Sequence, residues 1–351
     1  MNLGKFIIGD SMKHEVDLSK YSIRTDLVIE KENKNFEHQE EKIDNIKITT
    51  TKLKENNMVP NKKAGTYVTI EFEDITDSGN AKKVESVFEK ELKKLLKETK
   101  IKKTDTCLVV GLGNIDSTPD SIGPLTVQNI IVTNHIYLYD ELDANYRRVS
   151  SIAPNVTAVN GIETADYIKG IVNILKPDFL IVIDALASRS IERVNKTIQL
   201  SNTGITPGSG VGNNRTEISD QTLNIPVIAI GIPTVVDAVS VVANTFLFME
   251  KHYAFYKDFY QNPMSKMIPP GQINYMKKEF KMKKEDNEKI FGVLGTLEEE
   301  EIRNLIFEVL TPIGYNMIVT PKEVDFVVKK LSLLLSNGIN NSIHFKICNN
   351  C

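Results

Sequence analysis

Two aspartates follow short apolar stretches, and together they could hydrolyse an amide bond. Asp120 lies in Gly111–Pro124 (GLGNIDSTPDSIGP), which follows the apolar run CLVV, and Asp184 follows the apolar run FLIVI. In parallel sheets, ligands bind beyond the carboxyl ends of the strands. Two carboxylates at close range do not both ionise easily, so one can keep a proton while the other acts as a base toward water. Asp120 and Asp184 are therefore the candidate catalytic pair.

The spacing by itself leaves other interpretations of these segments open. An aspartate after a strand is often a helix N-cap, and Asp120 precedes Ser-Ile-Gly-Pro. Asp116 competes with Asp120 for the catalytic role. Gly111 and Gly113 resemble the start of a dinucleotide fingerprint, but Asp116 stands where that motif requires its third glycine. We therefore predict no nucleotide cofactor.

A second glycine-rich segment is a candidate substrate-binding loop. Its backbone amides and its arginine could hold a peptide main chain or an oxyanion, and a flexible loop is the alternative. The candidate residues are Gly208, Ser209, Gly210, Gly212 and Arg215. Ser209 as a nucleophile would need a histidine base, and none of the five histidines stands in a recognisable catalytic context.

The sequence contains no metal-binding motif such as HExxH or paired CxxC. His135 with Asp140, Glu141 and Asp143 could ligate a cation, although an exposed acidic helix end explains these residues more simply. We expect no metal. Cys107 opens an apolar strand and is predicted to be a packed core thiol.

The elements that must position these residues alternate between short apolar strands and amphipathic helices. We predict strands at 46–48, 68–72, 107–110, 156–159, 179–183 (ending on Asp184) and 226–230, and helices at 84–96, 122–132, 165–175 and 236–249. This alternation predicts an α/β fold, a three-layer sandwich with a mainly parallel sheet.

The two ends of the chain and one internal segment look different from this core. Residues 1–42 are predicted to be an exposed arm whose apolar patch, Ile23–Ile29, docks on the protein. Residues 272–289 are expected to form a mobile surface loop. Near the end, Thr320–Glu323 reads as a capping box that starts a helix, and Gly338 as its stop.

Composition excludes several classes of protein. The 351 residues include 43 basic and 46 acidic side chains, and this net charge of −3 argues against direct binding to nucleic acid. No apolar run approaches the ~18 residues of a membrane span, and no signal peptide is recognisable. The three cysteines are an odd and sparse set, which favours a reducing, cytoplasmic location.

Several long motifs occur in an order that carries a resemblance to a known family. They are SIRTDLVIE, GLGN with TPDSIGP, DALASRS, TGITPGSGVGNNR, PVIAIGIPTVVDA, TPKEVDFVV and SNGIN. From about Val16 to His344, the chain resembles the germination proteases of endospore-forming bacteria, which degrade small acid-soluble spore proteins. The resemblance implies a fold similar to hydrogenase-maturation peptidases, a homotetramer, and a location in the forespore and spore core.

The resemblance also implies an atypical aspartic peptidase without a required metal. The family's two catalytic aspartates lie in its TPD…GP and DALA motifs, which correspond here to Asp120 and Asp184. Asp116 has no such support. Two rival interpretations are a metal-dependent maturation-type peptidase of similar fold and a non-catalytic protein that binds spore proteins.

Finally, the resemblance implies an inactive zymogen that is trimmed at its N-terminus. The family's substrates are cut after an acidic residue and before a bulky apolar one, and Thr25–Glu30 (TDLVIE) imitates that pattern. We therefore expect residues 1–26 to be a propeptide, cut from a single peptidase domain of 27–351 by self-cleavage at Asp26–Leu27. If one carboxylate of the pair must be protonated, mild acid would favour activation.

Overall fold

The structure, a computed structural model, describes residues 25–31, 37–56, 58–59, 62–138, 145–208, 216–261, 282–310 and 317–345. These residues divide into two compact units. The larger unit contains residues 25–236 and 320–345, and the smaller unit contains residues 237–319. A single domain over 27–351 was predicted from the sequence. Both candidate aspartates belong to the larger unit.

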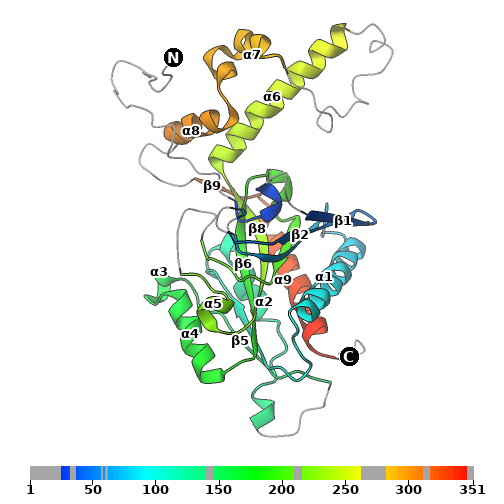
Figure 1. Cartoon of the computed structure of the whole chain (residues 1–351), viewed down its shortest axis with the longest axis vertical. Coiled ribbons are helices and arrows are strands. Elements are labelled where there is room, and N and C mark those ends of the chain that lie inside the picture. Colours follow the sequence, from blue (N-terminus) through cyan, green and yellow to red (C-terminus); the bar gives the residue numbers. More distant parts are fainter. Residues whose placement is uncertain are drawn as a thin grey trace. The chain divides into compact units, whose positions relative to one another are not determined.

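The larger unit is built on a mixed sheet in the order β1-β2-β3-β7-β8-β6-β4-β5. Figure 1 labels β1, β2, β5, β6 and β8 of this sheet. Its strands are β1 (Glu37–Ile43), β2 (Ile46–Leu53), β3 (Gly65–Glu71), β4 (Cys107–Gly111), β5 (Val149–Ile152), β6 (Phe179–Ser188), β7 (Thr197–Ser201) and β8 (Val227–Asp237). Strands β5, β4, β6 and β8 pair in parallel, and β1, β2, β3, β7 and β8 pair antiparallel. The predicted α/β fold with a parallel centre is therefore confirmed.

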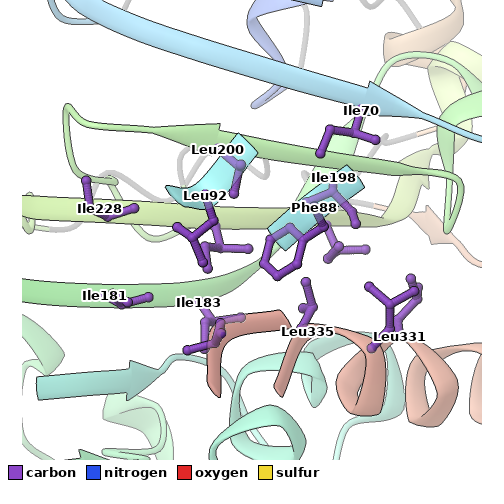
Figure 2. Packing of buried hydrophobic residues seen from close by; sticks show 14 of the residues in the cluster. Ile70, Phe88, Leu92, Ile181, Ile183, Ile198, Leu200, Ile228, Leu331 and Leu335 are labelled. Carbon is purple, nitrogen blue, oxygen red and sulfur yellow. The ribbon is translucent and has the colours of Figure 1, made fainter. Parts of the chain in front are cut away.

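Helices cover both faces of this sheet. One face packs against α1 (Ser78–Glu98), α2 (Ile122–Val127) and α9 (Val324–Ile343), and the other against α4 (Thr164–Leu175) and α5 (Asp220–Leu223). Figure 2 shows Phe88 of α1 between strand residues such as Ile198 and the α9 residues Leu331 and Leu335. Continuous apolar strands fit this arrangement because both of their faces are buried.

The smaller unit is largely helical. It contains α6 (Ala238–Gln261), α7 (Lys284–Phe291), η9 (Gly292–Thr296), α8 (Glu299–Leu310) and β9 (Ile318–Val319). Arg303 of α8 is fully buried, and its guanidinium donates to Glu299 at 2.9 Å and to Asn244 at 3.2 Å. None of the helices in the described ranges combines the length and apolar character that crossing a membrane requires.

The strand predicted at 156–159 is wrong. The strand of this region is β5, Val149–Ile152, and Thr157–Asn160 forms the short helix α3. β5 (VSSI) is an edge strand with one buried and three half-buried residues, so it lacks the continuous apolar run that marks the central strands.

The predicted limits of the last helix are also wrong. α9 begins at Val324 rather than in the Thr320 capping box, and it continues past Gly338 to Ile343. Gly338 lies against the Phe88 ring, where a β-carbon would stand 2.4 Å from Phe88 Cδ1. The glycine permits close packing of α9 on α1 and does not end the helix.

Other boundaries shift where tertiary contacts extend or shorten an element. α2 ends at Val127 rather than 132, and α6 starts at Ala238 and runs to Gln261. Residues 37–42 of the predicted exposed arm belong to strand β1, which pairs with β2, although the side chains of β1 are mostly exposed. Of the predicted loop 272–289, Lys284 onward is helical, and 272–281 lies outside the described residues.

Candidate active site

The sequence predicted that Asp184 ends its strand. In the structure, Asp184 lies within β6. β6 continues to Ser188 and pairs with β8 over that length, whereas β4 stops at Gly111, opposite Ile183. The Leu112 N–H donates the last bond between the two strands, to Ile183 O at 2.8 Å. Asp184 is therefore the first residue of β6 beyond the paired length of β4, and it is 6% exposed.

Asp120 ends the short 3-10 helix η2 (Thr118–Asp120), in the loop that leaves β4. Its Oδ2 accepts a 2.8 Å hydrogen bond from the Asn114 N–H. Gly113 has a φ of +110°, and a β-carbon there would lie 2.0 Å from Asp120 O. The loop thus folds tightly around the aspartate, which is half-buried. Asp120 is not the N-cap of α2, because Ser121 occupies that position.

The chain brings the Asp120 loop onto the end of β4 and onto β6 at Ile183. Gly123, at the start of α2, lies so close to these strands that a β-carbon on it would be 2.3 Å from Leu112 O and 2.8 Å from Ile183 O. η2 also contacts β6. Asp120 and Asp184 consequently both lie where β4 ends beside β6, whereas Asp116 is exposed. A buried and a half-buried carboxylate at one edge can divide the roles of acid and base.

The other predicted site residues contribute less to the described structure. Gly208 has a φ of +71°, and Ser209, Gly210, Gly212 and Arg215 lie outside the described residues, as do Asp140, Glu141 and Asp143. In the described part of the chain, no group of three or more histidine, cysteine or acidic side chains could hold a metal ion. Cys107 is a packed core thiol as predicted, and burial raises its pKa.

Residues 25–31 dock on β6, which bears out the predicted docking for that part of the apolar patch. The Asp26 N–H donates to Ala187 O, and the Ala187 N–H donates to Asp26 Oδ2, both at 3.0 Å. Gln199 of β7 binds the main chain of the docked segment through both atoms of its amide. Its Nε2 donates to Asp26 O at 3.3 Å, and its Oε1 accepts from the Val28 N–H at 2.8 Å. Leu27 is fully buried.

Glu30 anchors this segment through its carboxylate. The Glu30 side chain is 2% exposed. Ser188 Oγ donates to it at 2.8 Å, and the guanidinium of Arg193 at 3.2 Å. The N–H groups of Arg189 and Ser190 donate at 2.6 and 3.1 Å. Thr25 Oγ1 donates to it from within the segment, at 2.5 Å. We call the group formed by Ser188, Arg189, Ser190 and Arg193 the carboxylate nest.

Positive side chains surround the acidic end of the docked segment. Burial lowers the pKa of Lys62 to about 8, although the nearby Asp26 carboxylate raises it. Burial also lowers the pKa of Lys31. Asp26 and Glu30 raise it, but the net shift is downward. In the nest, burial lowers the pKa of Arg193, but Glu71 and Glu30 outweigh it and the net shift is upward.

Sequence reasoning missed the carboxylate nest and Gln199. The signal was present in part, since Ser188, Arg189 and Ser190 belong to the motif DALASRS that also contains Asp184. Serine and arginine after a strand are common at surfaces, so their residue types alone do not identify a binding site. Gln199 lies on a different strand and could be connected to Asp26 only through the fold.

Comparisons with known proteins agree with the motif resemblance. A family profile described as germination protease matches residues 15–351. A germination protease of Geobacillus sp. (strain WCH70) is 45% identical, covering 96% of this chain and 97% of that protein. A germination protease of Bacillus mycoides is 44% identical and also covers 96% of this chain and 97% of that protein. Among solved structures, the hydrogenase maturation protease HycI of Thermococcus kodakarensis matches 41% of this chain and 80% of its own, at 12% identity and a TM-score of 0.26.

Proposed function

The chain belongs to the germination protease family of peptidases, and on that premise we propose that it is an endopeptidase that hydrolyses small acid-soluble spore proteins during germination. We further propose that Asp120 and Asp184 activate the attacking water. The observation that carries this assignment is that the Asp120 loop is folded onto the end of β4 and onto Ile183 of β6, the residue before Asp184.

In this mechanism the two aspartates share one proton. The ionised carboxylate takes a proton from water as it attacks the peptide carbonyl, and the protonated one donates to the departing amine. Because a coupled pair titrates jointly, the roles of acid and base are not divided between the two residues here.

We also propose that the chain is made as a zymogen and cut by itself between Asp26 and Leu27. The docking of this segment on β6 supports the proposal, because Ala187 lies only three residues beyond Asp184, about 10 Å along an extended strand. Asp26 and Leu27 are 8% and 0% exposed, so a separate protease could reach their peptide bond only after the segment leaves its site. Cleavage within the molecule needs a smaller displacement.

The deciding experiment compares the wild type with Asp120→Asn and Asp184→Asn after incubation at mildly acidic pH, with intact-mass analysis. We expect only the wild type to lose residues 1–26 and to cleave an added small acid-soluble spore protein. Asp116→Asn is the matched control and should retain both activities. Equal trimming of all variants would refute self-processing, and spore-protein cleavage by either Asn variant would refute the aspartate pair. Loss of activity with a chelator would favour a metal-dependent peptidase instead.

Finally, we propose that the protein is a homotetramer in the spore core. The smaller unit exposes several large apolar side chains on α6, among them Phe248, Met249 and Tyr253, and such clusters favour self-association. Sedimentation equilibrium is the test, and a monomer at micromolar concentration would contradict the proposal.

A further inference from the structure

The carboxylate nest is assembled from one short stretch of chain. Three of its four members are consecutive, Ser188 to Ser190, and Arg193 follows at the end of η4 (Ile191–Arg193). Apart from Thr25, all the donors that the structure gives to the Glu30 carboxylate come from this stretch. The nest would therefore keep its donors if Glu30 left, and it could bind another carboxylate in the same way.

The nest stands at a defined distance from Asp184. The pairing of β6 with β8 shifts register between Leu186 and Ala187, but the extra residue, Thr234, is on β8. Side chains along β6 therefore keep alternating between its two faces, and Asp184 and Ser188 point to the same face. They are four residues apart, which is about 13 Å in an extended strand. A peptide that lies extended along β6, with its scissile bond at Asp184, would bring its fourth residue after that bond to the nest.

The docked segment carries its carboxylate at this position but does not present its peptide bond to Asp184. Glu30 is the fourth residue after the Asp26–Leu27 bond. However, Val28–Glu30 forms a 3-10 turn, η1, which rises about 2.0 Å per residue instead of about 3.3 Å. Asp26 lies beside Ala187, about 10 Å along β6 from Asp184, and the turn accounts for about 4 Å of that distance.

We propose that the side chains of Ser188 and Arg193 determine specificity and, with the main-chain N–H groups of Arg189 and Ser190, bind a substrate carboxylate at the fourth position after the scissile bond. In the uncut chain, Glu30 occupies the same nest while its turn holds the Asp26–Leu27 bond short of Asp184. Uncoiling of that turn, with Glu30 kept in place, moves the bond about 4 Å toward Asp184. The remaining distance requires the hydrogen bonds between Asp26 and Ala187 to break. This inference rests on the proposed peptidase function and adds the residues that set the register of the cut.

A binding experiment tests the nest without any need for catalysis. The protein is the full-length chain with Asp184→Asn, to prevent cleavage, and Glu30→Ala, to empty the nest. The probes are a fluorescent peptide of residues 22–33 and its Glu30→Gln version. We expect the glutamate peptide to bind at least about tenfold more tightly, since hydrogen bonds to a charged group are stronger than neutral ones. Equal Kd values for the two peptides would overturn the proposal.

Substitutions in the protein locate the effect. Arg193→Ala and Ser188→Ala should each reduce the preference for glutamate over glutamine, and Arg193→Ala should nearly abolish it. Lys196→Ala is the matched control, because it removes an exposed positive charge close to Arg193 in sequence but outside the nest. An unchanged glutamate preference in Arg193→Ala would show that the carboxylate binds elsewhere.

Cleavage kinetics separate this inference from the proposed function. The processed wild type is given peptides with glutamate at the third, fourth or fifth position after the scissile bond. We expect kcat/KM to be about tenfold higher for the fourth position, and Arg193→Ala to remove that difference. If cleavage occurs with the same preference in Arg193→Ala, the nest is refuted and the peptidase stands. If no peptide is cut while the difference in Kd holds, the peptidase function fails and the nest stands.

Discussion

Two buried charges fix chain segments in the larger unit, and they do so by opposite means. Glu30 is held by a continuous stretch, Ser188 to Arg193, that includes a positive partner. Arg147 is held by backbone carbonyls from separate segments: its guanidinium donates to Ile343 O at 3.1 Å, to Lys102 O at 2.8 Å and to Asp105 O. We call this second group the arginine clasp.

The difference separates an exchangeable site from a permanent one. The carboxylate nest has its donors in one piece, and its cation, Arg193, is also held by Glu71, so the nest can persist while its occupant changes. The arginine clasp exists only while the segments around Lys102, Asp105 and Ile343 are all in place, so removing Arg147 leaves their carbonyls without this donor. The clasp should therefore act on global stability, and the nest on local docking.

The largest effect is expected from Arg147→Ala. Losing a buried charged group with three carbonyl partners should reduce the free energy of unfolding by about 3–5 kcal/mol. Urea unfolding measures the change. The neighbouring Arg148→Ala is the control, because Arg148 is exposed, and it should change stability by less than about 1 kcal/mol. Equal effects of the two variants would remove the distinction between the clasp and an ordinary surface arginine.

A smaller and local effect is expected from Glu30→Gln in the uncut chain. The loss of charge-assisted bonds should weaken docking by about 1–3 kcal/mol. Hydrogen exchange should show faster exchange of the Ala187 and Val28 amides, with little change for the β4 amides. Glu192→Gln, at an exposed carboxylate beside the nest, should leave these rates unchanged. Uniformly faster exchange would mean that Glu30, like Arg147, supports the whole unit.

Lys62→Met should stabilise the uncut chain in a pH-dependent way. The pKa of Lys62 is lowered to about 8 by burial, so between pH 8 and about 10.5 the unfolded chain binds more protons than the folded one. Wild-type stability therefore rises through that window, while below pH 8 the full cost of the buried charge remains. The variant should exceed wild type by about 1–2 kcal/mol at pH 7, allowing for partial exposure, and the gap should close toward pH 10.5. A constant gap from pH 7 to 10.5 would contradict this assignment.

The smallest effect concerns His344, which completes the arginine clasp. Its Nδ1 accepts from the Arg147 N–H at 3.2 Å, and burial lowers its pKa. Because the unfolded chain takes up this proton near pH 6.5 and the folded chain does not, stability should fall as the pH drops below about 6.5. His344→Gln should reduce this slope in thermal unfolding between pH 5 and 7. The exposed His135, replaced in the same way, should leave the slope unaltered.

Much of the fold could be predicted because its core elements carry strong local patterns. The runs CLVV and FLIVI are buried on both faces as β4 and β6, and the 84–96 stripe is the inner face of α1. β5 was missed because an edge strand needs no continuous apolar run. Gly338 was misread because its neighbour across the helix interface, Phe88, is about 250 residues away in the sequence.

The sequence by itself determined which residues could do the chemistry. Asp120, Asp184 and TDLVIE were recognisable because their types and order form long motifs. Only the tertiary structure decided that β6 continues past Ile183, where its pairing with β4 stops. The backbone of β6 beyond that point is left open to Asp26 and Glu30, which dock there. A strand edge arises from the relative lengths of neighbouring strands, and those lengths depend on pairing between distant segments. No local pattern records that pairing, so the carboxylate nest became visible only in the folded chain.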